Sequence, residues 1–100
     1  MNELQLYEDI ELRKPVSLFT ADRHEVGTIL HRDYYLYNSS KDWPIGNISF
    51  ENKDPDLSID YSKTIGPNGL NKVSIDFKPP INRREKLQEN IIINGVLLIG

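Results

Sequence analysis

Apolar and polar residues alternate with a period of two along most of this chain, which is the spacing of side chains on a β-strand. From Leu4 to Leu18 the even positions are mostly apolar, and Pro15 interrupts the run. Because a proline cannot donate to a strand ladder, this segment predicts two short strands that meet at a bend. The alternation predicts further strands at 28–38, 43–50, 57–61, 70–78 and 91–99.

Turn-forming residues separate the predicted strands. The turns are "ADRHEVG" (21–27), "NSSKD" (38–42), "ENKDPD" (51–56) and "IGPNG" (65–69), each rich in glycine, proline or small polar residues. No ten-residue stretch shows an apolar stripe at helical spacing. About seven short strands with turns between them predict an all-β fold, an antiparallel β-sandwich.

The length of 100 residues suits one domain, because it leaves no room for a second hydrophobic core. We expect residues 26–99 to build the core of the sandwich. Residues 3–20 form an additional strand-like segment that we expect to pack on this core.

The chain ends on "ENIIINGVLLIG" (89–100), which is apolar on both faces of the predicted strand. One face carries Ile91, Ile93, Leu97 and Ile99, and the other carries Ile92, Val96 and Leu98. The dipeptide Asn94-Gly95 is a hairpin signal, whereas the short flanking arms favour one strand with a kink or bulge. We expect the single strand.

One sandwich buries only one face of a strand at its boundary, so the second apolar face of this strand needs a cover. Two covers remain open. The N-terminal segment could fold across it through Leu4, Leu6, Ile10 and Leu12. Alternatively, a neighbouring copy of the chain or a different protein could supply the cover.

Charge and composition narrow the function classes. The net charge of −3 argues against a general nucleic-acid or anionic-membrane binder, and we read the basic "NRREK" (82–86) as solvated. The absence of cysteine excludes disulfides and thiolate metal sites. The acidic N-terminus has no export signal and no apolar run is long enough to span a membrane, so we expect a cytoplasmic or virus-particle location.

Two stretches resemble a known family. "LYNSSKDWPIGNISF" (36–50) and "TIGPNGLNKVSIDFKPP" (64–80) are similar to the early and late signatures of abnormal-spindle/Hydin-type immunoglobulin-like domains. Through that group the chain also resembles major sperm protein and pilus-chaperone domains, over residues 26–99. The resemblance implies an immunoglobulin-like sandwich that serves as a non-enzymatic binding or scaffolding module, with no catalytic residues.

Candidate chemistry is sparse. The tripeptide His31-Arg32-Asp33 occurs in kinase catalytic loops, but no glycine-rich loop accompanies it. On a strand, His31, Asp33 and Tyr35 would line one face as a hydrogen-bonded surface row rather than an acid–base site. We therefore expect no enzyme activity, no catalytic residue, no metal site and no cofactor.

The candidate interaction residues are exposed aromatics and the second face of the last strand. They are Trp43, Tyr35, Tyr37, Ile92, Val96 and Leu98. These residues predict a structural or binding module that acts through protein–protein contacts, with protein partners or copies of itself, as an oligomer or assembly component. By elimination, a capsid-decorating or tail-associated virion protein fits this description. The alternative is a carbohydrate-binding module that uses Trp43 and the tyrosines.

Overall fold

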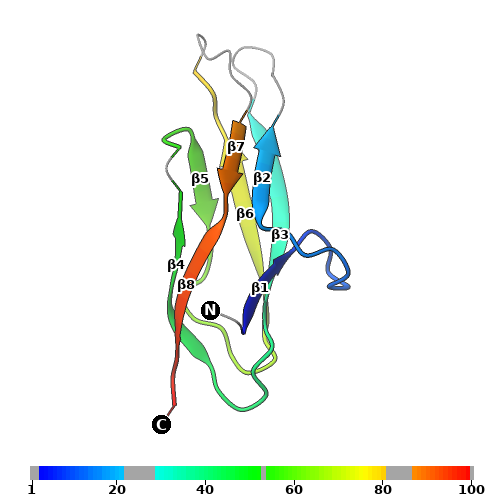
Figure 1. The fold of residues 1–100 in the computed structure, drawn as a ribbon, viewed down its shortest axis with the longest axis vertical. Coiled ribbons are helices and arrows are strands. Elements are labelled where there is room, and N and C mark those ends of the chain that lie inside the picture. The colour runs from blue at the N-terminus through cyan, green and yellow to red at the C-terminus, as the bar shows by residue number, and fades with distance from the viewer. Residues whose placement is uncertain (1–2, 22–28, 53, 81–86, 100) are drawn as a thin grey trace.

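The computed structural model describes residues 3–21, 29–52, 54–80 and 87–99. Within these ranges the chain forms eight strands and no helix (Figure 1). The strands are β1 (Leu4–Tyr7), β2 (Leu18–Ala21), β3 (Leu30–Asn38), β4 (Ile45–Glu51), β5 (Leu57–Asp60), β6 (Leu70–Phe77), β7 (Leu87–Asn90) and β8 (Ile92–Leu97). The basic "NRREK" segment (82–86) and most of the predicted turn at 21–27 lie outside the described residues.

Every strand pair is antiparallel. A four-stranded sheet has the order β1-β3-β6-β5, and two further sheets consist of β2 with β7 and of β4 with β8. The predicted all-β class is therefore confirmed. The described ranges hold eight strands where about seven were expected, because β7 lies just before the predicted last strand at 91–99 and was not itself predicted.

The pairing of β3 with β6 sets the two faces of the four-stranded sheet. Tyr34 lies opposite Val73 and both are buried, while Tyr35 lies opposite Lys72 on the other face. Because side chains alternate along a strand, the buried face continues through Ile75 and Phe77. This is the face that the sequence pattern of 70–78 predicts.

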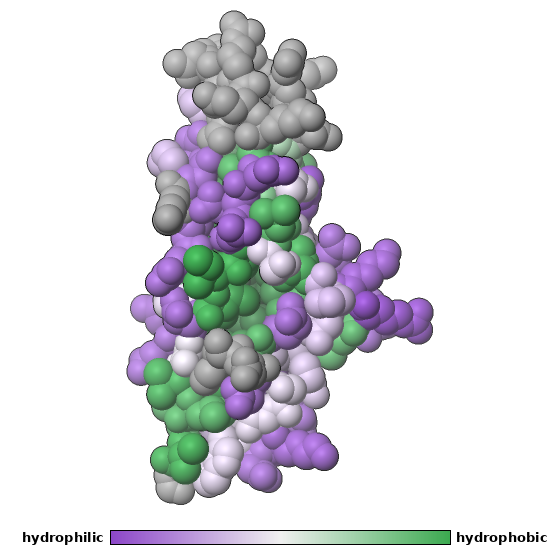
Figure 2. All heavy atoms as spheres, viewed as in Figure 1, coloured by the Kyte–Doolittle hydropathy of each residue, from purple (hydrophilic) through white to green (hydrophobic). Residues whose placement is uncertain are grey.

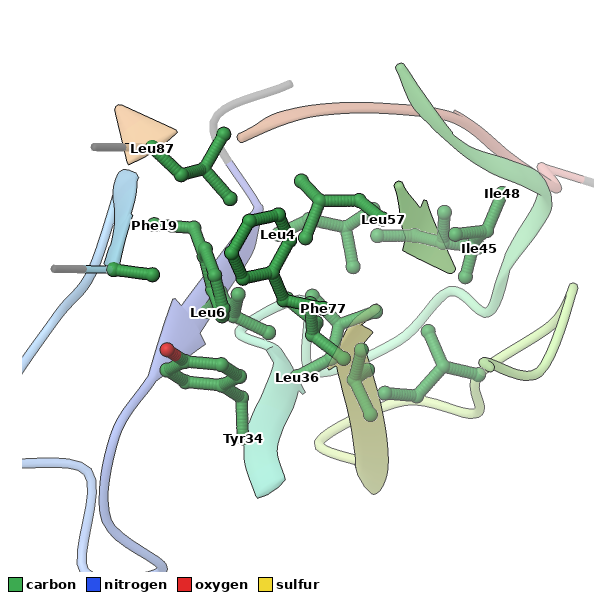
Figure 3. Packing of buried hydrophobic residues seen from close by; sticks show 14 residues of the cluster. Leu4, Leu6, Phe19, Tyr34, Leu36, Ile45, Ile48, Leu57, Phe77 and Leu87 are labelled. Atoms are coloured by element: carbon green, nitrogen blue, oxygen red, sulfur yellow. The ribbon is translucent and has the colours of Figure 1, made fainter. Parts of the chain in front are cut away.

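One hydrophobic core joins all three sheets (Figure 3). The four-stranded sheet contributes Leu36 and Phe77, the β2–β7 pair contributes Phe19 and Leu87, and the β4–β8 pair contributes Ile45. Burying an aliphatic or aromatic side chain of this size stabilises the fold by about 1.5–3 kcal/mol. The core thus holds the three sheets together although few backbone hydrogen bonds connect them.

The N-terminal segment divides between two sheets. Leu4 and Leu6 of β1 lie in the core at the edge of the four-stranded sheet, and β2 pairs with β7. Between them the chain turns back, and the Val16 N–H donates to the Leu6 carbonyl at 2.9 Å. The Asp9 carboxylate accepts the N–H of Lys14 at 2.9 Å and that of Arg13 at 3.0 Å, which fixes the intervening loop.

The last strand runs straight through Asn94-Gly95, so the prediction of one strand rather than a hairpin is confirmed. The irregularity lies instead in its neighbour β4, where the register with β8 shifts between Gly46 and Ser49. Asn47 occupies this bulge with a φ of 51°, in the left-handed region that asparagine tolerates.

Candidate functional site

The outer row of β8 consists of large aliphatic side chains in contact with solvent. Ile92 is 47% exposed, Val96 is 52% exposed and Leu98, just beyond the strand, is 44% exposed. The alternate residues Ile93 and Leu97 pack against the core. Figure 2 shows hydrophobic side chains gathered along the course of β8 down to the C-terminal end. The described part of the N-terminal segment does not cover this row.

Backbone contacts with β4 hold the C-terminal part of this row, at Val96 and Leu98, in place. The Leu98 N–H donates to the Pro44 carbonyl at 2.9 Å, and Gly46 lies opposite Val96. The Leu98 side chain lies on Gly46, where an added Cβ would be 2.9 Å from Leu98 Cδ1. Because glycine has no side chain, the Leu98 side chain packs directly against the backbone of Gly46.

One polar pair interrupts the aliphatic row. Asn94 Nδ2 donates to Glu51 Oε1 at 3.0 Å across the two strands. Beyond this pair, Ile92 borders a depression of about 390 Å³ that Phe50 and Gln88 also line. We name the outer side of β8, with Ile92, Asn94, Val96 and Leu98, the β8 outer face.

Trp43 lies near the C-terminal end of the β8 outer face. It belongs to the loop between β3 and β4, directly before the Pro44 carbonyl that binds Leu98, and it is 37% exposed. Asn38, fully buried, fixes this loop: its Nδ2 donates to the carbonyls of Trp43 and Gly66, each at 3.0 Å. The sequence pattern assigned Asn38 to a turn and did not reveal this buried role.

The structure does not bring Tyr35 and Tyr37 to the β8 outer face. Both are half-buried on the outer face of the four-stranded sheet, whose opposite face carries the core. Tyr37 donates its hydroxyl to Asn68 Oδ1 at 3.3 Å. The six candidate residues therefore do not share one surface: the two tyrosines lie on the four-stranded sheet, the three aliphatics lie on the β8 outer face, and Trp43 lies in the loop beside the end of β8.

A hydrogen-bonded polar cluster lies on the same outer face as the tyrosines. His31 Nδ1 binds Asp76, directly opposite on β6, and His31 Nε2 lies 2.8 Å from Asp33 Oδ1. Ser74 donates to Asp33 Oδ1 at 2.9 Å, and Lys72 Nζ lies 3.3 Å from Asp33 Oδ2. This is the arrangement that strand alternation predicts for His31 and Asp33.

Hydrogen bonds within the cluster shift the pKa values of His31 and Asp33. Hydrogen bonds to Asp76 and then to Asp33 raise the pKa of His31 above its ordinary value. The hydrogen bond from Ser74, followed by those from Lys72 and His31, lowers the pKa of Asp33. Because Ser74 donates to Asp33 and not to His31, the cluster does not form an activated serine nucleophile.

No group of three or more His, Cys, Asp or Glu side chains within the described ranges is arranged to hold a metal ion. In the same ranges, no helix has the length and apolar character needed to cross a membrane. Comparison with protein-family models, with curated proteins and with solved structures found no match.

Proposed function

We propose that this chain is a non-enzymatic structural or binding module that acts through protein–protein contact within a larger assembly. The observation that carries the proposal is the solvent exposure of Ile92, Val96 and Leu98 on the β8 outer face. Because about half of each side chain is already buried, covering the rest in a contact would contribute about half of the 1.5–3 kcal/mol that full burial gives. An exposed aliphatic row of this kind on a strand is typical of an interface and is otherwise an aggregation hazard.

The fold that we propose for this module is an immunoglobulin-like β-sandwich. One face of the four-stranded sheet packs on the core, and β2, β7, β4 and β8 contribute side chains to the same core. The similarity of 36–50 and 64–80 to immunoglobulin-like signatures supports the same assignment. The family that these two stretches resemble serves as binding or scaffolding modules, and this support is analogy, because a fold alone does not determine a function.

The setting that we propose is a virus particle, in which the chain would be a capsid-decorating or tail-associated component. The support is the sequence: no cysteine and no catalytic constellation, together with an apolar last strand. Mass spectrometry of purified particles tests it, and the chain should be present in many copies per particle. Absence of the chain from particles whose genome encodes it would reject the setting but not the contact role.

The contact role is tested by light scattering after size-exclusion chromatography over a concentration series. We expect the wild-type chain to show a mass above the 11.6 kDa of one copy, or to lose solubility. The triple variant Ile92→Ser, Val96→Ser, Leu98→Ser should remain soluble and monomeric. Its matched control is Ile10→Ser, because Ile10 is 62% exposed on the distant loop and should leave association unchanged.

A wild-type chain that stays soluble and monomeric throughout the series, and behaves like the triple variant, would overturn the proposal. The triple variant should remain cooperatively folded and lose no more than about 1.5 kcal/mol of its free energy of unfolding. Substitutions at exposed positions usually change the free energy of unfolding by no more than about 0.5 kcal/mol each.

A further inference from the structure

Among the residues that the structure describes, β8 is paired along one edge by β4 and has no strand partner along the other. Along a strand, successive backbone N–H groups point alternately to opposite sides. The Leu98 N–H donates to Pro44, on the β4 side, whereas the Ile91 N–H donates to the Ser17 carbonyl on the other side at 2.8 Å. The N–H and C=O groups of Ile93, Gly95 and Leu97 therefore point away from β4.

No described strand pairs with this second edge. β2 runs beside β7 and its contact ends where Ser17 binds Ile91, while β1 belongs to the four-stranded sheet. Along the edge lies an open groove of about 160 Å³, lined by residues that include Leu4, Val16 and Ile93.

The edge also lacks the features with which proteins usually block strand pairing. Natural edges carry charged side chains, prolines or bulges that prevent another strand from adding. Residues 91–99 contain no charged residue and no proline, and the bulge of this sheet lies in β4 and not in β8.

We propose that this edge pairs with the same edge of a second copy of the chain, antiparallel and about a two-fold axis at Gly95. The inference rests on the proposed contact role and names its partner. The two β4–β8 pairs would join into one sheet of order β4-β8-β8-β4. Ile93 of one copy lies opposite Leu97 of the other, and Gly95 lies opposite Gly95.

A second copy is the occupant because residues 91–99 carry no charge, so pairing with a copy buries no charged group, and the exposed aliphatics of the two copies can oppose one another. In this register Ile93, Gly95 and Leu97 of one copy lie opposite Leu97, Gly95 and Ile93 of the other. Each pair exchanges two N–H···O=C bonds. A register centred on Asn94 would instead require Ile91, whose N–H is already bonded to Ser17.

The outer-face side chains fit the same register. Ile92 of one copy would lie opposite Leu98 of the other, so that two exposed aliphatics cover each other. Val96 would lie opposite Asn94 beside the central pair. The two-fold arrangement therefore satisfies the backbone edge and reduces the exposure of the aliphatic row together.

Amide hydrogen exchange followed by NMR tests the pairing at the backbone. We expect the N–H groups of Ile93, Gly95 and Leu97 to exchange at least about tenfold more slowly at high concentration than at low concentration. The mass should rise to twice 11.6 kDa over the same range. Val96→Lys should abolish both changes, because it places two charges beside the axis, whereas Ile10→Lys should abolish neither.

Cysteine cross-linking tests the register, since the chain has no cysteine of its own. Asn94 and Val96 of the two copies form a closely spaced pair in this register. A mixture of Asn94→Cys and Val96→Cys chains should therefore form the disulfide-linked dimer faster than either variant alone.

The outcomes separate this inference from the contact role. If the chain associates and the triple serine variant abolishes association, but Ile93, Gly95 and Leu97 exchange equally fast at all concentrations, edge pairing is wrong and the contact role stands. If the chain neither associates nor precipitates, both proposals fail.

Discussion

Gly95 of β8 lies directly against Ile45 of β4. A Cβ added at position 95 would be 2.7 Å from Ile45 Cγ2 and 3.0 Å from Leu4 Cδ1. Both neighbours are buried core side chains, so neither can move away without disturbing the packing. The close approach of β8 to the core therefore depends on glycine at this position.

Gly95→Ala should destabilise the protein by about 1–3 kcal/mol, because overpacking displaces the two aliphatic neighbours. Chemical denaturation measures the free energy of unfolding. The matched control is Gly66→Ala, where an added Cβ meets nothing within 4 Å and the backbone is not left-handed. Equal stability of the two variants would contradict the packing that we describe for Gly95.

Asn38→Ala should cost about 1–3 kcal/mol, because it removes two donated hydrogen bonds and one accepted hydrogen bond of a fully buried side chain. The wild-type side chain binds the carbonyls of Trp43 and Gly66 and accepts the Ser40 N–H at 2.9 Å. The control is Asn71→Ala, which removes one hydrogen bond to Thr64 at an exposed site and should have little effect. A near-neutral Asn38→Ala would show that the two loops do not depend on it.

His31 should titrate above its ordinary pKa of 6.5, because Asp76 and Asp33 bind the charged imidazole. Folding raises this pKa, so the cluster stabilises the fold at low pH, and that contribution is lost as pH rises from about 6.5 through the raised pKa. NMR titration of the ring protons measures it. Asp76→Asn should lower the pKa of His31, and a His31 that titrates at 6.5 or below would contradict the cluster.

Arg32→Met should destabilise the fold by about 1 kcal/mol through loss of a cation–π contact and a hydrogen bond. Arg32 Cζ lies 4.8 Å from the centre of the Phe19 ring, and Nη1 donates to the Thr20 carbonyl at 2.6 Å. The control is Arg13→Met, since the Arg13 side chain forms an ion pair with Glu11 on a solvent-exposed loop, where such a pair contributes little. Thermal unfolding measures the loss of stability in both variants. An equal loss would contradict a stabilising contact of Arg32 on β3 with Phe19 and Thr20 on β2.

Glycans should not change the tryptophan fluorescence of this chain if contact with protein is its role. Trp43 is the single tryptophan, so the signal reports on one site. Titration with a panel of oligosaccharides measures it. A saturable shift that disappears in Trp43→Ala would favour the carbohydrate-binding alternative over the proposed contact role.

The last strand shows which of its properties the sequence pattern could predict and which it could not. Alternation predicted one strand with aliphatics on both faces, and β8 has both rows. The pattern left open whether the N-terminal segment covers the second row. That depended on where β1 and β2 pair, and they pair with β3 and β7, far along the chain.

The aromatic candidates show the opposite case. Residue type alone indicated Trp43, Tyr35 and Tyr37 as one class of exposed contact residues. Strand pairing places the two tyrosines on the outer face of the four-stranded sheet and Trp43 in a loop beside the end of β8. The role of Asn38 was equally hidden, because its partners lie in two loops that only the folded chain brings together.

The sequence alone determined which side chains share a strand face and that the chain is all-β, because side chains alternate with a period of two on any strand. The tertiary structure decided which strands are neighbours, which face of β8 is exposed and which of its edges has no partner among the described strands. These properties depend on hydrogen bonds and packing between residues distant in sequence, and a local pattern carries no information about such partners.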